Sequence, residues 1–210
     1  MDGVFMKKLW NRVLIILLLT SCFRFGGLVA DKQQLGNQLI RFHVVANSDT
    51  AADQAMKLEV RDAVLESLRE GLESCRDQET AIAYLKTNLP KIEMAANEVL
   101  RTYGTDFKAV ATLCKETFDV RYYDSFTLPS GIYESLRIRI GKAEGKNWWC
   151  VVFPSFCLPA ATESFSDIAV GAGFSEDLIH TLEGRKDYQI RFFLLDLLGK
   201  MENILSEDRI

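Results

Sequence analysis

Histidine and closely spaced cysteines are scarce in this 210-residue chain. The two histidines are His43 and His180, and no two cysteines are separated by only two residues. Structural zinc sites use close pairs of cysteine or histidine ligands, so the sequence predicts no metal site. The same cysteine spacing means that the chain has no Cys-x-x-Cys motif of the kind that thiol redox enzymes use. A glycine-rich phosphate loop is missing too, and we therefore expect no cofactor.

Long runs of basic residues are also missing. The formal net charge of the whole chain is −4, and residues 31–210 carry 21 basic and 28 acidic side chains. Such a domain is repelled by nucleic-acid phosphates. We therefore predict no nucleic-acid partner.

The N-terminus does carry a long apolar run. Residues 13–23, "VLIILLLTSCF", have no charge and follow Lys7, Lys8 and Arg12. A basic segment before an apolar segment is typical of an export signal. We therefore assign residues 1–30 to a signal peptide or membrane anchor.

Three fates of this segment place the rest of the chain outside the cytoplasm. "LVA" at 28–30 fits a cleavage site, and the run extended to Ala30 is close to the ~20 residues that a spanning helix needs. The third fate is lipidation, because "LTSC" fits a lipoprotein motif that ends at Cys22. In that case the protein is a structural lipoprotein.

Four cysteines follow the leader: Cys75, Cys114, Cys150 and Cys157. An even number outside the cytoplasm favours disulfides, although four cysteines allow three connectivities. A chain reversal at Pro154 would bring Cys150 and Cys157 within the ~7 Å between Cα atoms that a disulfide requires. We predict this pair, with the alternative that both are small buried hydrophobic residues.

The hydrophobic pattern predicts an α+β fold, in which an antiparallel sheet of about four to five strands has helices packed on one face. Residues 31–38 are polar and are interpreted as a linker or frayed end. Expected helices cover 50–72, with Thr50 and Asp53 at the spacing of a capping box, then 78–88, 90–103, a short stretch near 175–182 and a C-terminal helix at 188–205. Expected strands cover 39–46, 106–114, 116–124, 133–141 and 148–153, and the last two form a hairpin. We divide the chain into a domain at 31–158 and an extension at 159–210.

The best candidates for catalysis are His43, Ser48 and Asp49, which are close in sequence. They would serve a cell-wall hydrolase, but no G-x-S-x-G motif surrounds Ser48. Asn47, Ser48 and Asp49 lie between a strand and a helix, where such residues cap helices. We therefore predict no catalytic residues and keep the extracytoplasmic hydrolase as an alternative.

Two features are candidates for binding a partner. Asp53, Lys57 and Arg61 recur every four residues and form one charged stripe on the predicted helix. Trp148 and Trp149 are adjacent on a predicted strand, so their side chains must point to opposite faces. One indole can fill the core, and the other is then covered by another segment or free for a partner.

Two long segments resemble one protein family. "IRFHVVANSDTAADQAMKLEVRDAVL" and, further on, "LPSGIYESLRIRIGKAEGKNWWCVVFPSFC" are similar to two sequence blocks of the stage II sporulation protein R family. The resemblance covers residues 39–158. Ser130, Ser155 and Phe156 depart from the usual family residues, and the resemblance implies no role for residues 159–210.

The resemblance implies a function. Members of the family are exported from the forespore into the space between two membranes, where they activate a membrane-embedded aspartic protease of the mother-cell membrane. That protease processes the precursor of sigma-E. The protein would then be an activator and not an enzyme, without a small-molecule substrate. The expected partner-binding residues are Asn47, Ser48, Asp49, Asp53, Lys57, Arg61, Trp148 and Trp149.

Overall fold

The computed structural model describes residues 3–156 and 164–207. Its helices are α1 (Gly3–Gln38), α2 (Ala51–Glu73), α3 (Gln78–Thr102), α4 (Phe165–Gly171), α5 (Glu176–Leu182), the short 3-10 helix η1 (Lys186–Tyr188) and α6 (Gln189–Glu207). Its strands are β1 (Ile40–Val45), β2 (Ala109–Phe118), β3 (Arg121–Tyr122), β4 (Thr127–Leu128), β5 (Gly131–Ile140) and β6 (Asn147–Phe153). The α+β class is confirmed.

The main sheet has four strands in the order β2-β5-β1-β6. β5 is antiparallel to β2 but parallel to β1, and β1 is antiparallel to β6. The sheet is therefore mixed rather than purely antiparallel. β3 and β4 form a separate two-stranded ribbon.

The predicted hairpin between β5 and β6 is wrong, because β1 lies between these strands. All six residues of β1 are buried, as in a central strand with both faces covered. Such a strand needs hydrogen-bonding neighbours on both edges. Residues 141–146 consequently pass over the end of β1 instead of making a tight turn.

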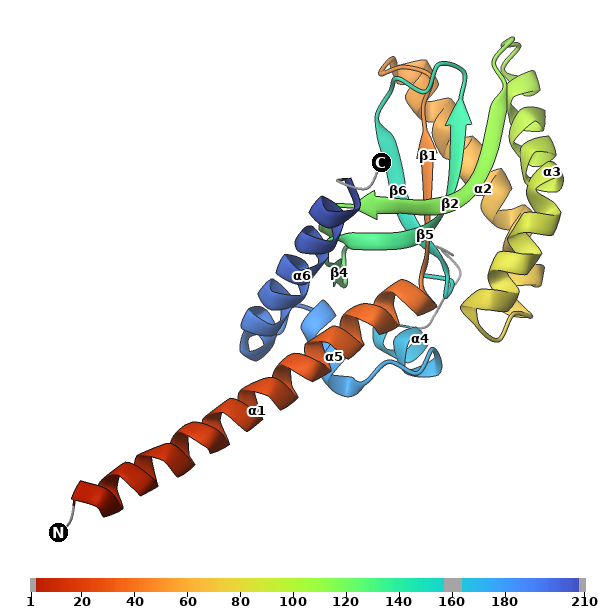
Figure 1. Cartoon of the computed structure of the whole chain (residues 1–210). Helices are drawn as coiled ribbons and strands as arrows, with labels where there is room; N and C mark the ends of the chain where they lie inside the picture. The colour runs from red at the N-terminus through yellow and green to blue at the C-terminus, as the bar shows by residue number, and fades with distance from the viewer. Residues whose placement is uncertain (1–2, 157–163, 208–210) are drawn as a thin grey trace.

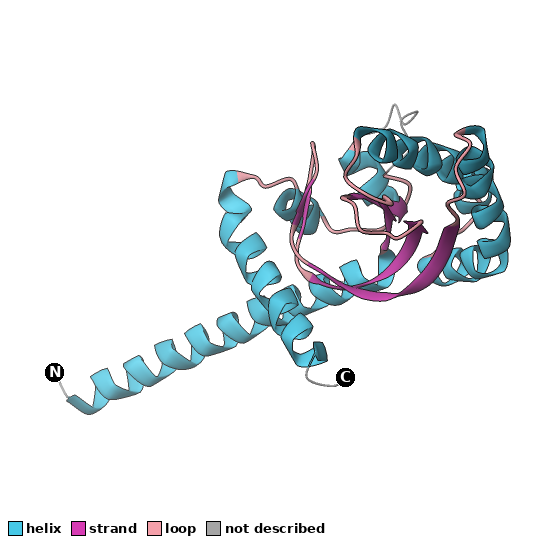
Figure 2. Cartoon of the chain, turned by 90° about the horizontal axis from the view of Figure 1, so that it is seen from above, coloured by secondary structure: helices cyan, strands magenta, loops and turns pink. Residues whose placement is uncertain are grey.

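Helices cover both faces of the sheet (Figure 1). α2 and α3 pack on the face that carries Phe42, Val44 and Ile138 and form the helical layer that the sequence predicted. The other face packs against α1, α4, α5 and α6 through residues such as Leu35 and Leu195. The view from above in Figure 2 shows the sheet between these two groups of helices.

The expected linker at residues 31–38 is instead the last part of α1. Leu35 is fully buried, Asp31 pairs with Arg191 at 2.6 Å, and Lys32 pairs with Glu202. The segment is helical because Leu28 and Leu35 lie on one side of the helix and pack against the second core.

Two predicted boundaries inside the chain are also wrong. α3 is one helix that contains Pro90, because Leu85 and Ile92, on either side of the proline, remain buried against the same core. β2 is one strand across the expected break at Lys115, because each of its ten residues is paired with β5.

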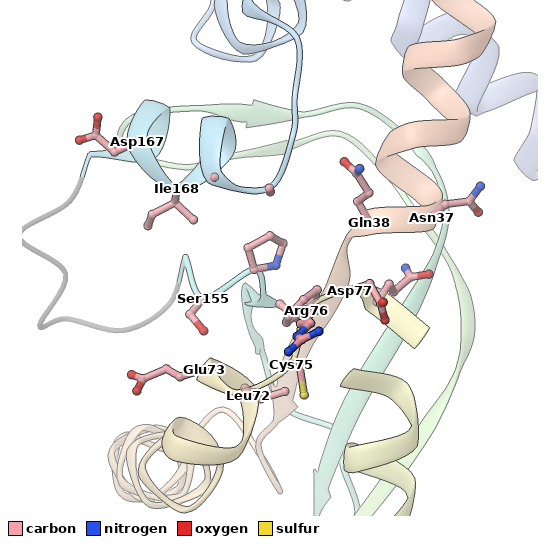
Figure 3. A pocket seen from close by; sticks show the side chains of 15 residues that line it. Asn37, Gln38, Leu72, Glu73, Cys75, Arg76, Asp77, Ser155, Asp167 and Ile168 are labelled. Carbon is pink, nitrogen blue, oxygen red and sulfur yellow. The ribbon is translucent and has the colours of Figure 1, made fainter. Parts of the chain in front are cut away.

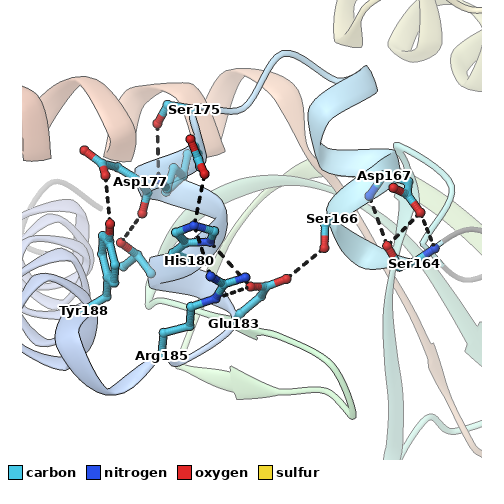
Figure 4. Close-up of polar contacts among 12 residues, drawn as sticks. Ser164, Ser166, Asp167, Ser175, Asp177, His180, Glu183, Arg185 and Tyr188 are labelled. Atoms are coloured by element: carbon cyan, nitrogen blue, oxygen red, sulfur yellow. Dashed lines mark hydrogen bonds and ion pairs between the residues drawn. The ribbon is translucent and has the colours of Figure 1, made fainter.

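The C-terminal extension contains the expected helices α5 and α6, together with α4, which the sequence did not predict. Hydrogen bonds join these elements (Figure 4): Ser166 donates to Glu183 and Tyr188 donates to Asp177. His180 is partly buried, 3.2 Å from an Arg185 nitrogen. Residues 164–207 thus form part of the second helical layer.

Gly199 lets α6 approach the sheet closely. An ideal Cβ at this position would lie 1.6 Å from the carbonyl oxygen of Ser130, which is backbone and cannot rotate away. We expect Gly199→Ala to reduce the free energy of unfolding by about 2–3 kcal/mol, as over-packing does. Thermal unfolding of the full-length chain in detergent, followed by circular dichroism, measures this change.

Gly171, in α4, provides the matched control, because a Cβ there would meet nothing within 4 Å. Gly171→Ala should leave stability unchanged or raise it by about 0.4–1 kcal/mol. Equal effects of the two substitutions would show that the contact between α6 and Ser130 is not tight.

Candidate functional site

The candidate site is the junction between β1 and α2, together with the loop 141–146 that lies over it. Asn47 reaches both parts: its Oδ1 accepts a hydrogen bond from the backbone N–H of Lys142 at 3.0 Å, and its Nδ2 donates to Asp53 at 2.9 Å. Ser48 Oγ also donates to the Asp53 carboxylate, at 2.5 Å. Thr50 caps α2, because its hydroxyl accepts a hydrogen bond from the backbone N–H of Asp53. The other half of the expected capping box is replaced, since the backbone N–H of Thr50 donates to Ser48 Oγ at 3.2 Å.

Asp49 and Lys57 hold the second half of the loop. Asp49 Oδ1 accepts a hydrogen bond from the backbone N–H of Lys146 at 2.6 Å. Lys57 Nζ donates to the carbonyl of Lys146 at 3.0 Å and to Gln54 Oε1 at 2.6 Å. Both backbone groups of Lys146 are therefore bound by side chains from the junction and α2.

Gly145 allows the loop to touch the junction. Its N–H donates to the carbonyl of Ala46, and an ideal Cβ at this position would lie 2.3 Å from the carbonyl oxygen of Ser48. Any other residue would push the loop away. The two segments that resemble blocks of a known family therefore meet in space. The first supplies the junction and the second supplies the loop.

The junction changes the proton affinity of two side chains. The hydrogen bonds from Ser48 and Asn47 lower the pKa of Asp53, because they stabilise its ionised form. Burial lowers the pKa of Lys57, since the ammonium group loses part of its hydration. The predicted charged stripe on α2 is therefore largely used in contacts within the molecule.

The two tryptophans point to opposite faces of β6, as predicted. Trp148 packs on the α2–α3 side, with its ring centre 5.9 Å from that of Phe42 and 4.7 Å from the Arg61 guanidinium. Trp149 lies on the other side and stacks on His43 at 4.5 Å. Both indoles are half-buried.

The structure thus brings most of the predicted partner-binding residues together. Asn47, Ser48, Asp49, Asp53, Lys57, Arg61 and Trp148 lie around the junction and the adjoining side of α2, whereas Trp149 lies on the opposite face of the sheet. Sequence reasoning missed the exposed loop residues Lys142, Glu144 and Lys146. Their closely spaced charges around Gly145 were the available signal.

His43 and Ser48 have different partners. His43 is buried beneath Trp149, and its Nε2 lies 2.9 Å from Glu116, which in turn pairs with Arg137 at 2.6 Å. Ser48 bonds to Asp53 and Thr50. Among the described residues, no hydrogen bond joins His43 to Ser48 or Asp49, so the geometry gives no support to a catalytic triad.

Arg41 is a buried cation beside this chain of polar contacts. The side chain is fully buried, and its guanidinium lies 4.3 Å from the ring centre of Phe118 and 5.1 Å from that of Tyr133. Its Nη2 donates a hydrogen bond to the Tyr123 hydroxyl at 3.1 Å. Aromatic faces compensate part of the cost of burying the charge.

The cysteines differ in their bonding. Cys150 is disulfide-bonded, whereas Cys22, Cys75 and Cys114 have free thiols. Cys157 lies outside the described residues, so the disulfide between Cys150 and Cys157 stays a prediction. Burial raises the pKa values of the Cys75 and Cys114 thiols, which makes them less reactive.

A separate pocket of about 800 Å³ lies at the opposite end of β1 (Figure 3). The ends of α1 and α2, the link between α2 and α3, the turn after β6, and α4 line it. Its charged lining residues are of both signs and include Glu73, Arg76 and Asp77. This mixed lining selects no class of ligand. Within the described residues, no group of three or more acidic, histidine or cysteine side chains could hold a metal ion.

The fold and site define an α+β domain that continues from a long apolar N-terminal helix. By length and composition the Trp10–Gln38 segment could cross a membrane, although a signal sequence near the N-terminus has the same character. Comparison with known proteins identifies the family. Residues 36–163 match the family "Stage II sporulation protein R (spore_II_R)".

The chain is 33% identical over 172 residues to the stage II sporulation protein R of Bacillus subtilis (strain 168). The similarity covers 82% of this chain and 72% of that protein. No solved structure matches the chain. The chain belongs to the stage II sporulation protein R family.

The Asp53 carboxylate should stabilise the junction in a pH-dependent manner. Asp53→Asn removes an ionised acceptor and should reduce the free energy of unfolding by about 1 kcal/mol at neutral pH. Since the fold lowers the pKa of Asp53, its stabilisation is complete above the ordinary value of ~4 and is lost as the pH falls through the lowered pKa. The difference between the two proteins should therefore shrink below about pH 4.

Chemical unfolding of the full-length chain in detergent at pH 7 and pH 3 measures this difference. Asp62→Asn is the control, because Asp62 is exposed and pairs with its neighbour Arg61 at the surface of the same helix. The control should change stability by less than about 1 kcal/mol. A difference for Asp53→Asn that is as large at pH 3 as at pH 7 would contradict the assigned role of the carboxylate.

Proposed function

We propose that this protein is an exported sporulation signal. It acts in the space between the forespore and mother-cell membranes and activates a membrane-embedded aspartic protease of the mother-cell membrane. The activated protease then cleaves the sigma-E precursor. The N-terminal segment exports the domain and, when it is not cleaved, keeps the domain attached to the forespore membrane.

Family membership carries this proposal, because the matching residues 36–163 include β1, the junction, α2 and the loop 141–146. The apolar helix α1 supports export. It continues without a break into the domain, so an uncleaved α1 would hold the domain close to the membrane surface.

Action by contact rather than by catalysis fits the geometry of the candidate residues. Ser48 is a hydrogen-bond donor within the junction, and His43 is stacked against Trp149 and bonded to Glu116. A nucleophile requires a base within hydrogen-bond reach. An activator requires only a surface that binds the active state of its receptor more tightly than the inactive state.

The loop 141–146 is the most suitable contact surface of the junction. Its backbone is fixed by Asn47, Asp49 and Lys57, whereas the side chains of Lys142 and Lys146 are exposed. A surface that is rigid before binding loses little conformational entropy when it binds. With Glu144 also exposed, the loop carries a net positive charge, which favours an acidic surface on the receptor.

Reconstitution in a non-sporulating bacterial host tests the proposal. The full-length protein is expressed with the candidate protease and the sigma-E precursor, and precursor cleavage is followed on gels. We expect cleavage that requires the protein, its leader and the protease together. Absence of cleavage, with the protein exported and folded, would contradict the proposal.

Ser48→Ala separates contact from catalysis in the same assay. The substitution removes one hydrogen bond to Asp53 and should cost about 1 kcal/mol of stability, so an exported and folded variant should retain most of its activating effect. A loss of about a thousandfold in a folded variant would favour the hydrolase alternative, because removal of a catalytic nucleophile has an effect of that order.

Charge reversal in the loop should weaken activation. We expect Lys142→Glu combined with Lys146→Glu to lower precursor cleavage about tenfold at equal protein level, a change that corresponds to about 1.4 kcal/mol of binding free energy. Lys86→Glu combined with Lys91→Glu makes the same change in net charge at exposed positions of α3. Equal losses for the two pairs would exclude the loop as the contact surface.

A further inference from the structure

The outer face of α6 is apolar and exposed. We name as the α6 stripe the six side chains of Ile190, Phe193, Leu197, Met201, Ile204 and Leu205, which are 77%, 64%, 43%, 52%, 61% and 60% exposed, respectively. Their spacing of mostly three or four residues places them on one side of a helix. α6 lies beyond residues 36–163, so the family match assigns it no role.

The α6 stripe points away from the sheet. The opposite side of α6 carries the fully buried Leu195, and Asp196 accepts a hydrogen bond there from the backbone N–H of Ser130. Asn203 donates to the carbonyl of Phe118 on the same inner side. The inner contacts fix the rotation of α6 about its axis, and the stripe is therefore left facing outward.

α6 crosses α1 where the apolar part of α1 ends. Arg191 of α6 pairs with Asp31 at 2.6 Å, and Glu202 pairs with Lys32. Before these residues, α1 leaves the domain, and its apolar side chains, such as Leu18 and Phe25, are exposed. Figures 1 and 2 both show α6 beside the point at which α1 emerges.

We propose that the α6 stripe lies in the interfacial region of the lipid bilayer that α1 enters. This inference rests on the membrane attachment in the proposed function. Amphipathic helices bury an apolar face about 5–10 Å into the boundary between head groups and acyl chains. A helix that crosses α1 just beyond its apolar part, with its apolar side away from the sheet, is placed for such burial.

The charges of α6 indicate which property of the lipid matters. Arg191 is paired with Asp31, and Lys200 is paired with Asp196 at 2.8 Å. These cations are neutralised within the molecule. The contact should therefore depend on apolar burial and not on anionic head groups, and it should form on neutral phosphatidylcholine.

A second copy of the chain is the competing occupant of the stripe. In a single chain, however, the exposed apolar part of α1 already brings a bilayer next to α6, and no second molecule is needed to cover the stripe. Two contacts, α1 and α6, would also orient the domain. The junction would then face away from the bilayer, because β1 starts beside α1 and ends at the junction.

Fluorescence quenching in neutral vesicles tests the inference with the full-length chain. An environment-sensitive NBD dye is attached in separate proteins to Leu197→Cys in the stripe, to Met94→Cys and to the native Cys22; the other free thiols are replaced by serine. Met94 is the matched control, because it is 66% exposed on α3, which packs on the opposite face of the sheet from α6. We expect doxyl-labelled phosphatidylcholine to quench the dye at position 197 several-fold more than at position 94, and aqueous iodide to show the opposite order.

Equal access of iodide to positions 197 and 94 would overturn the inference. Shielding of position 197 from both quenchers, with disulfide cross-linking between Leu197→Cys chains, would also overturn it and identify a second copy as the occupant. The dye at Cys22 reports separately on α1. If that dye is in water, the membrane attachment of the proposed function fails and the inference fails with it. If that dye is in the bilayer but position 197 is open to iodide, only the inference fails.

Discussion

The insertion of β1 between β5 and β6 is the constraint on which the remaining structure depends. Because β1 separates these strands, residues 141–146 must pass over its end, directly above the start of α2. The polar residues Asn47, Asp49 and Lys57 then bind the backbone of the passing segment. The polar residues of the junction therefore resemble a binding site, but this strand order already requires them to hold the loop.

The same central position requires cover on both faces of β1. One face carries Phe42 and Val44 toward α2 and α3, but the other carries Arg41 and His43. These two polar side chains are buried among aromatic rings, and His43 is bonded to Glu116. The end of α1 and residues 164–207 share the core on this face, so the described part of the C-terminal extension packs with the domain.

Local patterns in the sequence predicted the features that depend on neighbouring residues. Examples are the Thr50 cap of α2, the strand 39–46, the terminal helix and the opposite directions of Trp148 and Trp149. The strand order, the helical state of residues 31–38 and the continuity of α3 through Pro90 depend on contacts between distant segments. For the site, the residue types indicated which residues form the junction. They did not indicate the burial of Lys57 or the role of the exposed loop, because both follow from the insertion of β1.

The orientation of β1 connects the proposals. A single residue lies between the end of α1 and the start of β1, and β1 leads directly to the junction. The strand therefore separates the α1 end of the domain from the loop 141–146. Six residues at ~3.3 Å each place the loop roughly 20 Å further along the strand. In the proposed arrangement, α1 and α6 lie at the forespore membrane, and the loop points toward the mother-cell membrane. A receptor in that opposite membrane would meet the rigid, charged loop first, whereas a receptor in the same membrane would have to reach around the domain.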